Sequence, residues 1–351
     1  MAGATTTWFD NRLKFNAEAF TKYMEQMPRT KTWAFMKSGI VRNDATIISA
    51  FSSQSGAYSQ RMPIYGDAEA DEANYDGKTP MGEPGYQDSY SRAVIAYGRQ
   101  FALAEKDFSY DLIPGADFGA VLRQHIGINR DNKFEKRLLD ITNALFSFAD
   151  DSSAEGDFAK THTTDLSALE GEAAVIGDTT LNDTIQKASR EFKSDYTAIA
   201  VHSQVATNLE NKKLVQYAKG VDANGVIKDL SIPMWNGKML IIDDSLPVSG
   251  DKYTSYIFGM GAFSYAELPV TTPYEPVRDP ELAIDKMYVR YREVLAPKGF
   301  SFEGTPTSLS PTDAELANKD NWKLADNGKS AGDRKTYPIE RIPLARIISK
   351  G

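Results

Sequence analysis

The three histidines of this chain, with the serine and aspartates near them, are the residues best suited to chemistry. His125 lies on the apolar side of a predicted helix, where a histidine is usually a packed core residue. His162 lies in a threonine-rich linker, and His202 ends a predicted strand. None stands at metal-ligand spacing. Cysteine is absent, which excludes disulfides, thiolate zinc sites and cysteine nucleophiles.

His202 and Ser203 are adjacent, a pairing that would serve a serine hydrolase if the fold added an aspartate. A nucleophile of that kind sits in a G-x-S-x-G turn, and none surrounds Ser203. We keep a hydrolase of α/β type as an alternative, to be favoured if Ser203→Ala abolished esterase activity.

Two further motifs resemble binding sites. Asp243 and Asp244 follow a predicted strand, where carboxylates can bind metal, but Ser245 favours a solvated turn. The segment 259–261, Gly-Met-Gly, lacks the third glycine and the following helix of a nucleotide fingerprint. We therefore predict no catalytic residue, no cofactor and no metal.

Composition and charge restrict the class of protein. The chain has 351 residues, a net charge of −8 and a pI near 5.1. An acidic protein is a poor general binder of nucleic acid, because phosphates require a basic surface. No apolar signal core follows Met1, and no run of 18 apolar residues occurs. We expect a soluble protein made in the cytoplasm.

The stretch 116–149 is the organising element and predicts one long amphipathic helix. Its second half repeats apolar residues at helical spacing, namely Phe134, Leu138, Ile141, Leu145 and Phe148. Its first half has a second stripe of different phase, made of Phe118, Val121, His125 and Ile128. We expect a bend or break at Gly127. Its basic residues, Arg123, Arg130, Lys133, Lys136 and Arg137, are interpreted as a solvated face.

The region 56–98 is rich in Gly, Pro, Asp, Glu and Tyr, and its central part, YGDAEADEANYDGKTPMGEPGYQD, has too little apolar surface to fold on itself. Its tyrosines favour contact surfaces. Loops longer than about 15 residues are usually functional. We therefore predict a long projecting hairpin whose tip is ordered by another molecule. Residues 92–110 are expected to return to the body as part strand and part helix.

The remaining elements form a sequence of short segments. We expect an N-terminal helix within 8–27 capped by Asn16, extended runs from Thr46 and a polar connection over 150–160. A small α/β layer follows, with helices over 182–193 and 203–215, the second capped by Ser203, and strands at 197–201 and 238–242. Further strands are predicted at 253–258, 263–268, 283–295 and 300–303, with an extended final run over 337–349.

Several stretches, taken in order, resemble tailed-bacteriophage major capsid proteins of the HK97-like fold. They are the acidic tyrosine-bearing loop, AEKDFSYDLIPGADFGAVL leading into the long helix, AIAVHSQVATNLENKKLVQYAKGVDANGVIKDLSIPMWNGKMLIIDDSLPV, APKGFSFEG, DNWKLAD and YPIERIPLARIIS. The resemblance runs from about Trp33 to the end.

The resemblance implies an α+β fold with five parts. They are an N-terminal arm (1–45), an extended loop with its return strands (46–110), a peripheral domain with the spine helix (111–174), an axial α/β domain (175–275), and a return strand with the C-terminal part of the peripheral domain (276–351).

The resemblance also implies a function, which is a structural shell and not an enzyme. The chain would self-assemble through hexamers and pentamers into an icosahedral shell around packaged double-stranded DNA, in the virion, after assembly in the host bacterial cytoplasm. Partners would be other copies, a separate scaffolding protein, a portal and, in some shells, a decoration protein, with no membrane. An encapsulin nanocompartment of the same fold is the main alternative.

The extended loop would supply the contacts between subunits. The residues assigned to this contact are Tyr65, Asp67, Glu69, Asp71, Glu72, Tyr75, Asp76, Lys78 and Tyr86. Some members of the family cross-link a loop lysine to an asparagine. Lys78 is the only lysine near the tip of this loop, and we expect no cross-link.

Overall fold

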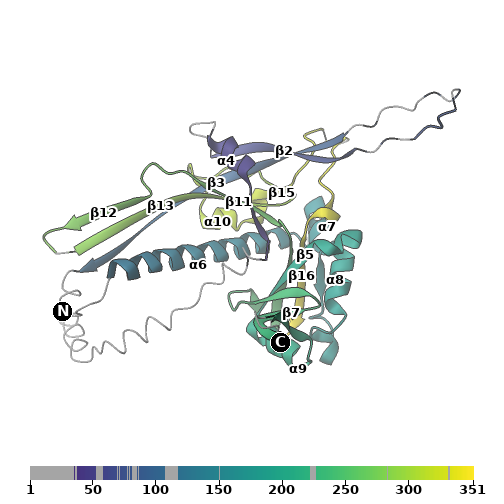
Figure 1. The fold of residues 1–351 in the computed structure, drawn as a ribbon. Coiled ribbons are helices and arrows are strands. Elements are labelled where there is room, and N and C mark those ends of the chain that lie inside the picture. The colour runs from purple at the N-terminus through teal and green to yellow at the C-terminus, as the bar shows by residue number, and fades with distance from the viewer. Residues whose placement is uncertain are drawn as a thin grey trace.

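The computed structural model describes residues 35, 38–52, 58–68, 70, 72–76, 78, 80, 85, 87–106, 118–149, 151–221, 227–282, 284–330 and 333–351. Two large sheets and one long helix dominate the described part of the chain (Figure 1). The expected N-terminal helix over 8–27 lies outside the described residues.

The first sheet is built around two long strands, β3 (Gln87–Lys106) and β13 (Ile284–Pro297). Its order is β1-β11-β13-β3-β2, and β12 also pairs with β13. The other strands are β1 (Val41–Asn43), β11 (Phe263–Leu268), β2 (Ser59–Ala68) and β12 (Tyr274–Asp279). Strand β3 pairs with β2 from Gln87 to Ile95 and with β13 from Ala96 to Lys106. One strand therefore belongs to two hairpin-like projections that point in opposite directions (Figure 1).

Helix α6 (Phe118–Phe146) confirms the predicted long helix. The predicted apolar stripe is buried at Phe134, Leu138, Ile141 and Leu145. A bend or break was expected at Gly127. The break is wrong, because the helix runs through this residue without interruption. Upstream, Ile126 is buried, whereas His125 is only half-buried. The side chains of Phe118 and Val121 lie outside the described residues, so the second stripe stays a prediction.

The second sheet has the order β4-β16-β10-β5-β8-β7-β6, with β9 paired to β10. Its strands are β4 (Thr163–Asp165), β16 (Leu344–Lys350), β10 (Lys252–Gly259), β5 (Tyr196–Val201), β8 (Lys238–Ile242), β7 (Ile227–Trp235), β6 (Val215–Val221) and β9 (Val248–Ser249). Helices α8 (Thr180–Ser189) and α9 (Ser203–Asn211) pack on it through Ile185 and Leu209. This is the predicted α/β layer.

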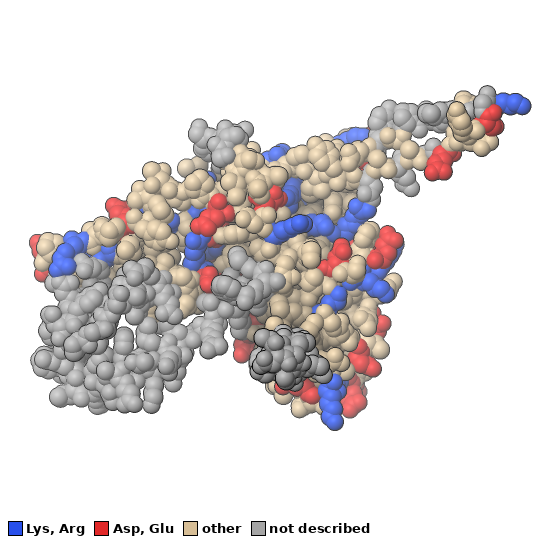
Figure 2. Space-filling model, in the orientation of Figure 1, with Lys and Arg blue, Asp and Glu red and all other residues tan. Residues whose placement is uncertain are grey.

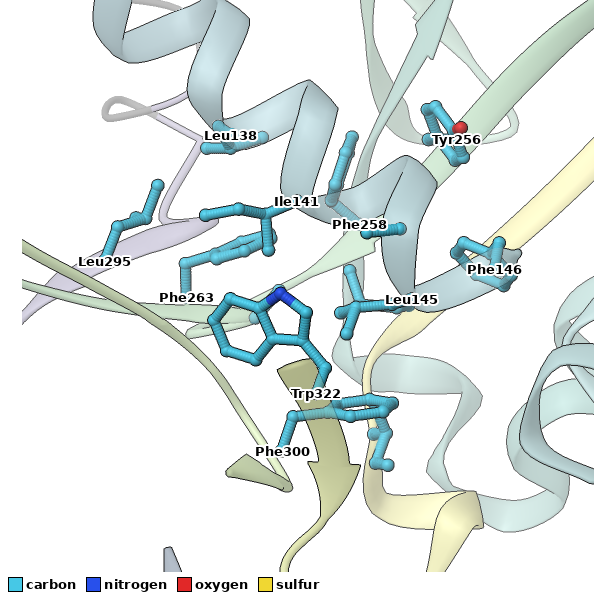
Figure 3. Packing of buried hydrophobic residues seen from close by; sticks show 14 of the residues in the cluster. Leu138, Ile141, Leu145, Phe146, Tyr256, Phe258, Phe263, Leu295, Phe300 and Trp322 are labelled. Carbon is cyan, nitrogen blue, oxygen red and sulfur yellow. The ribbon is translucent and has the colours of Figure 1, made fainter. Parts of the chain in front are cut away.

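The main core lies where α6 meets both sheets (Figure 3). Leu138, Ile141 and Leu145 project from the helix toward Phe258 of β10 and Phe263 of β11. A small two-stranded sheet, β14 (Phe300–Phe302) with β15 (Trp322–Leu324), closes this core from the C-terminal part of the chain. The helix therefore fixes the two sheets to each other through shared apolar contacts.

Four predictions of local structure are wrong. Residues expected to be extended from Thr46 form helix α4 (Ala45–Ser52). The expected polar connection contains helix α7 (Ala154–Thr161), because the Ser153 side chain caps it by accepting from Gly156 N. The return segment is strand throughout to Lys106. Helix α9 ends at Asn211, and its N-cap is His202 instead of Ser203.

The remaining short elements lie mostly in the C-terminal third. They are α10 (Asp313–Leu316) and the 3-10 turns η1 (Gly171–Ala174), η2 (Arg190–Asp195), η3 (Lys319–Asn321) and η4 (Ile339–Arg341). Strands β6, β7 and β12 had no counterpart in the sequence prediction. The final strand β16 pairs with β10 and β4 in the second sheet, and not with the sheet that holds β13.

Candidate assembly surface

The projecting hairpin is formed by β2 and β3, which pair in antiparallel register from Ser59↔Ile95 to Ala68↔Gln87. The register shifts between Tyr65 and Ala68, so the ladder is irregular just before the tip. Figure 1 shows the hairpin extending well beyond the body of the molecule. The prediction of a long projecting hairpin is confirmed in its strands.

The described residues of the tip are in solvent. Tyr65 is 67% exposed and Tyr75 is 103% exposed. Glu72, Asp76 and Lys78 are also exposed. A local turn orders Asp76, whose carboxylate accepts from Lys78 N at 2.8 Å and from Asn74 Nδ2 at 3.2 Å. Figure 2 shows acidic side chains toward the far end of the hairpin.

The exposure of the other predicted contact residues is not described. Glu69, Asp71 and Tyr86 lie outside the described residues, as does the side chain of Asp67. The contact role of the whole set thus stays a prediction.

Ion pairs and a backbone hydrogen bond hold the base of the hairpin on the C-terminal part of the chain. Arg61 Nη2 lies 2.9 Å from Glu303 Oε2, and Lys335 Nζ lies 3.1 Å from Asp88 Oδ1. Ser91 N donates to the Asp326 carbonyl at 2.7 Å. These pairs are largely exposed, so each contributes at most about 1 kcal/mol. The backbone bond and the β2–β3 ladder fix the direction of the hairpin.

A cavity of about 370 Å³ opens at this base. It is lined by Arg61, Ser91, Ser301, Glu303, Lys323, Leu324, Asp326, Gly328, Lys329 and Arg334. Sequence reasoning missed it, because most of these residues belong to the stretch 304–336 or border it, and that Pro- and Asp-rich stretch was assigned no site. The one available signal was the recurrence of basic residues there at 319, 323, 329, 334 and 335.

The basic residues of α6 form the solvated face that the sequence indicated only in part, and the side chain of Arg123 lies outside the described residues. Lys133 and Lys136 are exposed, but Arg137 is buried and Arg130 is half-buried. Arg130 Nε donates to Glu293 Oε1 at 2.8 Å, and Arg130 Nη2 to Glu267 Oε1 at 2.8 Å. Arg130 thus ties the helix to β13 and β11.

Arg137 is held in a second polar cluster beneath the first sheet. Its Nε donates to Asp313 Oδ1 at 2.8 Å, and its guanidinium lies 4.5 Å from the centre of the Tyr97 ring. Tyr97 is fully buried, and its hydroxyl donates to Glu293 Oε2 at 3.2 Å. Burial, and secondarily the Glu293 carboxylate, raise the pKa of Tyr97 well above its usual value, so it remains a neutral donor.

The residues considered for catalysis are not arranged for it. His202 Nδ1 accepts from Gln204 N at 3.2 Å and so caps α9, while Asp244 lies 3.7 Å from Nε2. In a hydrolase triad the histidine nitrogen opposite the carboxylate accepts from the serine, whereas here that nitrogen, Nδ1, accepts from the Gln204 backbone. Asp243 Oδ1 accepts from Ser245 N at 2.9 Å, which forms the expected turn.

His162 and the segment 259–261 take part in the packing and the turns of the fold. His162 is completely buried, and its Nδ1 donates to the Leu344 carbonyl at 2.6 Å. Gly261, with φ of +66°, allows the tight turn from β10 to β11, and no helix follows it. Within the described ranges no group of three or more metal-ligating side chains is found. No described helix is long and apolar enough to cross a membrane.

Comparison with known proteins agrees with this arrangement. Residues 143–332 match the model of the Gp13-like family, described as "Major capsid protein 13-like". The major capsid protein of Bacillus phage SPP1 is 27% identical over 300 residues, which cover 84% of this chain and 87% of that protein.

Solved structures give weaker likenesses. One from Mycobacterium phage Bobi is 11% identical, covers 93% of each chain and has a TM-score of 0.48. The holo-SrpI encapsulin complex from Synechococcus elongatus PCC 7942 is 12% identical, with 99% of this chain and 95% of that chain covered and a TM-score of 0.44.

The family match spans more than half of the chain. It includes the end of α6, strands β11, β12 and β13 of the first sheet, and every strand of the second sheet except β16. The chain belongs to the Gp13-like family of phage major capsid proteins. Its α+β fold, with a projecting hairpin, a long helix and two sheets, agrees with the HK97-like architecture expected from the sequence. Membership in this family gives the chain a structural role as part of a virion.

Proposed function

We propose that this chain assembles through hexameric and pentameric capsomers into an icosahedral shell that encloses the packaged double-stranded DNA of a tailed bacteriophage. Assembly takes place in the host bacterial cytoplasm, and the product is the head of the virion. The chain has no catalytic activity of its own in this proposal. Its family supports the class of function, and the hairpin supports the mode of assembly.

The observation that carries the proposal is the hairpin itself. A pair of strands is at best marginally stable in water without another layer to cover it. Beyond Tyr65 the described tip residues are exposed and Tyr75 has no contact that hides its ring. An exposed tyrosine with acidic neighbours on a projecting arm is suited to a protein contact. In a shell, the neighbouring subunit would supply the missing layer.

The tip contact would combine aromatic and charged groups. Tyr65, Tyr75 and Tyr86 would pack on the neighbour, while the acidic side chains would face basic groups there. The acidic set is Asp67, Glu69, Asp71, Glu72 and Asp76, and Lys78 would add one basic group. Such charges would select the partner and the register more than they would add affinity.

The division of the chain into shell parts is also a proposal. Residues 1–45 would be the arm, 46–110 the extended loop, 111–174 the peripheral domain and 175–275 the axial domain, with 276–351 returning to the peripheral domain. Pairing of β16 with β10 and β4 argues that the last seven or so residues belong with the axial sheet instead.

Other components would complete the particle. We propose a separate scaffolding protein, a portal and, where present, a decoration protein. DNA would be enclosed without sequence-specific binding, and a net charge of −8 fits a container whose wall does not hold its contents. No membrane takes part.

The test is assembly of the purified protein, alone and with the scaffolding protein encoded beside its gene. Negative-stain microscopy and sedimentation should show capsomers or closed shells in at least one preparation. Particles from infected cells should protect DNA from nuclease, whereas an encapsulin would enclose a cargo enzyme. A protein that stays monomeric at high concentration in both preparations would contradict the proposal.

The tip contact has its own test. Reversing the charge at all five acidic positions should block assembly while leaving the subunit folded by circular dichroism. Tyr75→Ala should weaken assembly without a charge change. Unchanged assembly of both variants would show that the tip makes no contact that matters.

A further inference from the structure

The cavity at the base of the hairpin has an excess of positive charge. Its lining contains four basic side chains, of Arg61, Lys323, Lys329 and Arg334, and two acidic ones, of Glu303 and Asp326. They come from three segments, namely β2, the residue after β14, and the stretch 323–334, which the fold brings together. The cavity therefore presents a basic site on a protein whose overall charge is negative.

Both carboxylates of the cavity are already engaged within the chain. Glu303 accepts from Ser301 Oγ at 2.7 Å and from Arg61 Nη2 at 2.9 Å. Asp326 accepts from Gly328 N at 2.8 Å and pairs with Arg334 Nη2 at 2.5 Å. The carboxylates thus neutralise the two arginines.

The two lysines of the cavity differ from its two arginines in their charge environment. Lys323 and Lys329 are both exposed, and neither has an ion-pair partner among the residues that the structure describes. Lys323 extends from β15, directly opposite Ser301 in the register of the small sheet. The unneutralised charge of the cavity is therefore carried by these two side chains.

The lining indicates what kind of group would enter. A volume of about 370 Å³ lies in the range of small binding pockets, about 300–1,000 Å³. Pockets for small organic ligands are mostly apolar, whereas Leu324 is the only aliphatic side chain in this lining. Two lysines beside neutralised ion pairs fit one or two carboxylates on a projecting segment.

The chain itself provides such a segment, but not to its own cavity. Residues 67–76 contain five acidic side chains, and Glu72 is exposed with no ion pair among the described residues. The hairpin runs outward from its base, and its far end does not return to the body (Figure 1). Figure 2 shows acidic side chains toward the far end of the hairpin, away from the body of the molecule. A tip can therefore reach the base cavity only of another copy.

We propose that the cavity at the hairpin base, through Lys323 and Lys329, receives the acidic hairpin tip of a second copy of this chain, with Glu72 entering it. This rests on the proposed assembly function and names the receiving surface. Each copy then gives a tip and receives one, which makes the contact heterologous. A heterologous contact closes into a ring when its rotation allows, and otherwise continues as a filament. Closed rings are what capsomers require.

The test is a charge exchange between the two surfaces in the full-length protein. Glu72→Lys and Lys329→Glu are made singly and together, and the same set is made with Lys323→Glu. The double variants keep the net charge of −8, because one change adds two charges and the other removes two. Assembly is followed by sedimentation and negative-stain microscopy, with circular dichroism to check folding.

Each single variant should raise the protein concentration needed for assembly several-fold, and one of the doubles should restore it toward wild type. Restoration separates a direct contact from an effect of net charge, which would move the two singles in opposite directions. Normal assembly of all singles, or singles that no double restores, would overturn the receiving site while the shell function stands. Absence of assembly by the wild-type protein would instead count against the proposed function.

Discussion

Arg137 Nε donates a hydrogen bond to Asp313 Oδ1 over 2.8 Å and so joins the middle of helix α6 to the short helix α10. The two ends of this bond differ in environment, because the Arg137 side chain is 3% exposed and the Asp313 side chain is 51% exposed. Arg99 Nη2 approaches the same Oδ1 at 2.7 Å. Asp313 is thus shared by two arginines, and Arg137 has no second carboxylate within ion-pair distance among the described residues.

We predict that Asp313→Ala destabilises the subunit more than Arg137→Met does. Removing Asp313 leaves a buried guanidinium without its carboxylate, a change that costs about 3 kcal/mol or more. Removing Arg137 leaves a half-exposed carboxylate that keeps Arg99, and methionine retains the contact with Tyr97, so the loss should be about 1–2 kcal/mol. Urea unfolding of unassembled protein measures both.

Glu191→Ala is the control for this pair, because Glu191 is exposed on η2. Its effect should stay within about 0.5 kcal/mol. The order of the two losses is the decisive result. If Arg137→Met were the more damaging change, packing of the arginine stem would matter more than its charge.

The Asp313 carboxylate should also link stability to pH. Burial raises its pKa, but the hydrogen bonds from Arg137 and Arg99 lower it by more, so the net shift is downward. Its contribution is therefore present above the usual aspartate pKa and is lost as pH falls through the lower folded value.

His162 gives a second, separable dependence on pH. Burial lowers its pKa from 6.5 to about 4, opposed by its hydrogen bond to the Leu344 carbonyl. The unfolded chain therefore binds a proton between pH 6.5 and 4 that the folded chain does not. Stability is fully present above pH 6.5 and falls as pH drops toward 4, by up to about 3 kcal/mol.

We predict that His162→Phe removes this part of the acid sensitivity. Phenylalanine keeps a ring beside Phe158, whose centroid lies 4.4 Å from the imidazole, but cannot be protonated. At neutral pH the variant should be less stable, because the Leu344 carbonyl loses its donor. The free energy of unfolding should then change less between pH 6.5 and 4 than in wild type.

The long helix could be predicted because its signal is local. Leu138, Ile141 and Leu145 repeat at the period of a helix, and burial follows from that period wherever a sheet covers the face. The expected break at Gly127 failed for a physical reason. A glycine costs a helix only about 1 kcal/mol, and the buried side chains of Ile126 and of the stripe from Phe134 onward offset that cost.

Strand β3 was harder to predict, because its apolar run, Ala93 to Tyr97, has no helical or alternating pattern that decides between the two structures. Its pairing with β2 and β13 decides for strand, and those partners lie far away in sequence. Helix α7 did carry a local signal that was missed. Ser153 precedes Glu155 and Asp157, the pattern of a cap with an acidic first turn.

The cavity at the hairpin base could not be found from the sequence. Arg61 and Glu303 are 242 positions apart, and only the three-dimensional fold brings them together. The acidic tip, in contrast, was visible as composition. Sequence therefore indicated the group that reaches out, while the structure was needed to find a surface that could receive it.

The capping box of α10 should stabilise the loop that carries Asp313. Thr312 Oγ1 accepts from Glu315 N at 3.2 Å, and Thr312 N donates to Glu315 Oε2 at 2.7 Å. Hydrogen bonds from Thr307 and from Thr312 lower the pKa of Glu315 to about 2. We predict that Thr312→Ala costs about 1 kcal/mol and that Thr312→Ser costs much less. Urea unfolding checks both, and equal losses would show that the methyl group, not the cap, matters.

Two glycines with left-handed backbone conformations allow the energetic cost of that conformation to be compared with the cost of steric crowding. Gly299 has φ of +80° in the turn from β13 to β14, and Gly328 has φ of +68° at the rim of the base cavity. A Cβ on Gly299 would lie 2.8 Å from Tyr337 Cδ1 and 2.9 Å from Ile342 Cγ1, whereas nothing lies within 4 Å of one on Gly328.

We predict that Gly328→Ala costs about 1 kcal/mol, because only the backbone conformation is penalised. Gly299→Ala should cost at least twice as much, because Tyr337 and Ile342 are buried and must shift to admit the methyl group. Thermal unfolding of the two variants under one set of conditions gives the comparison. Equal losses would mean that the core around β14 accommodates a methyl group freely. In that case β14 and β15 would not hold the base of the hairpin as rigidly as a contact between subunits requires.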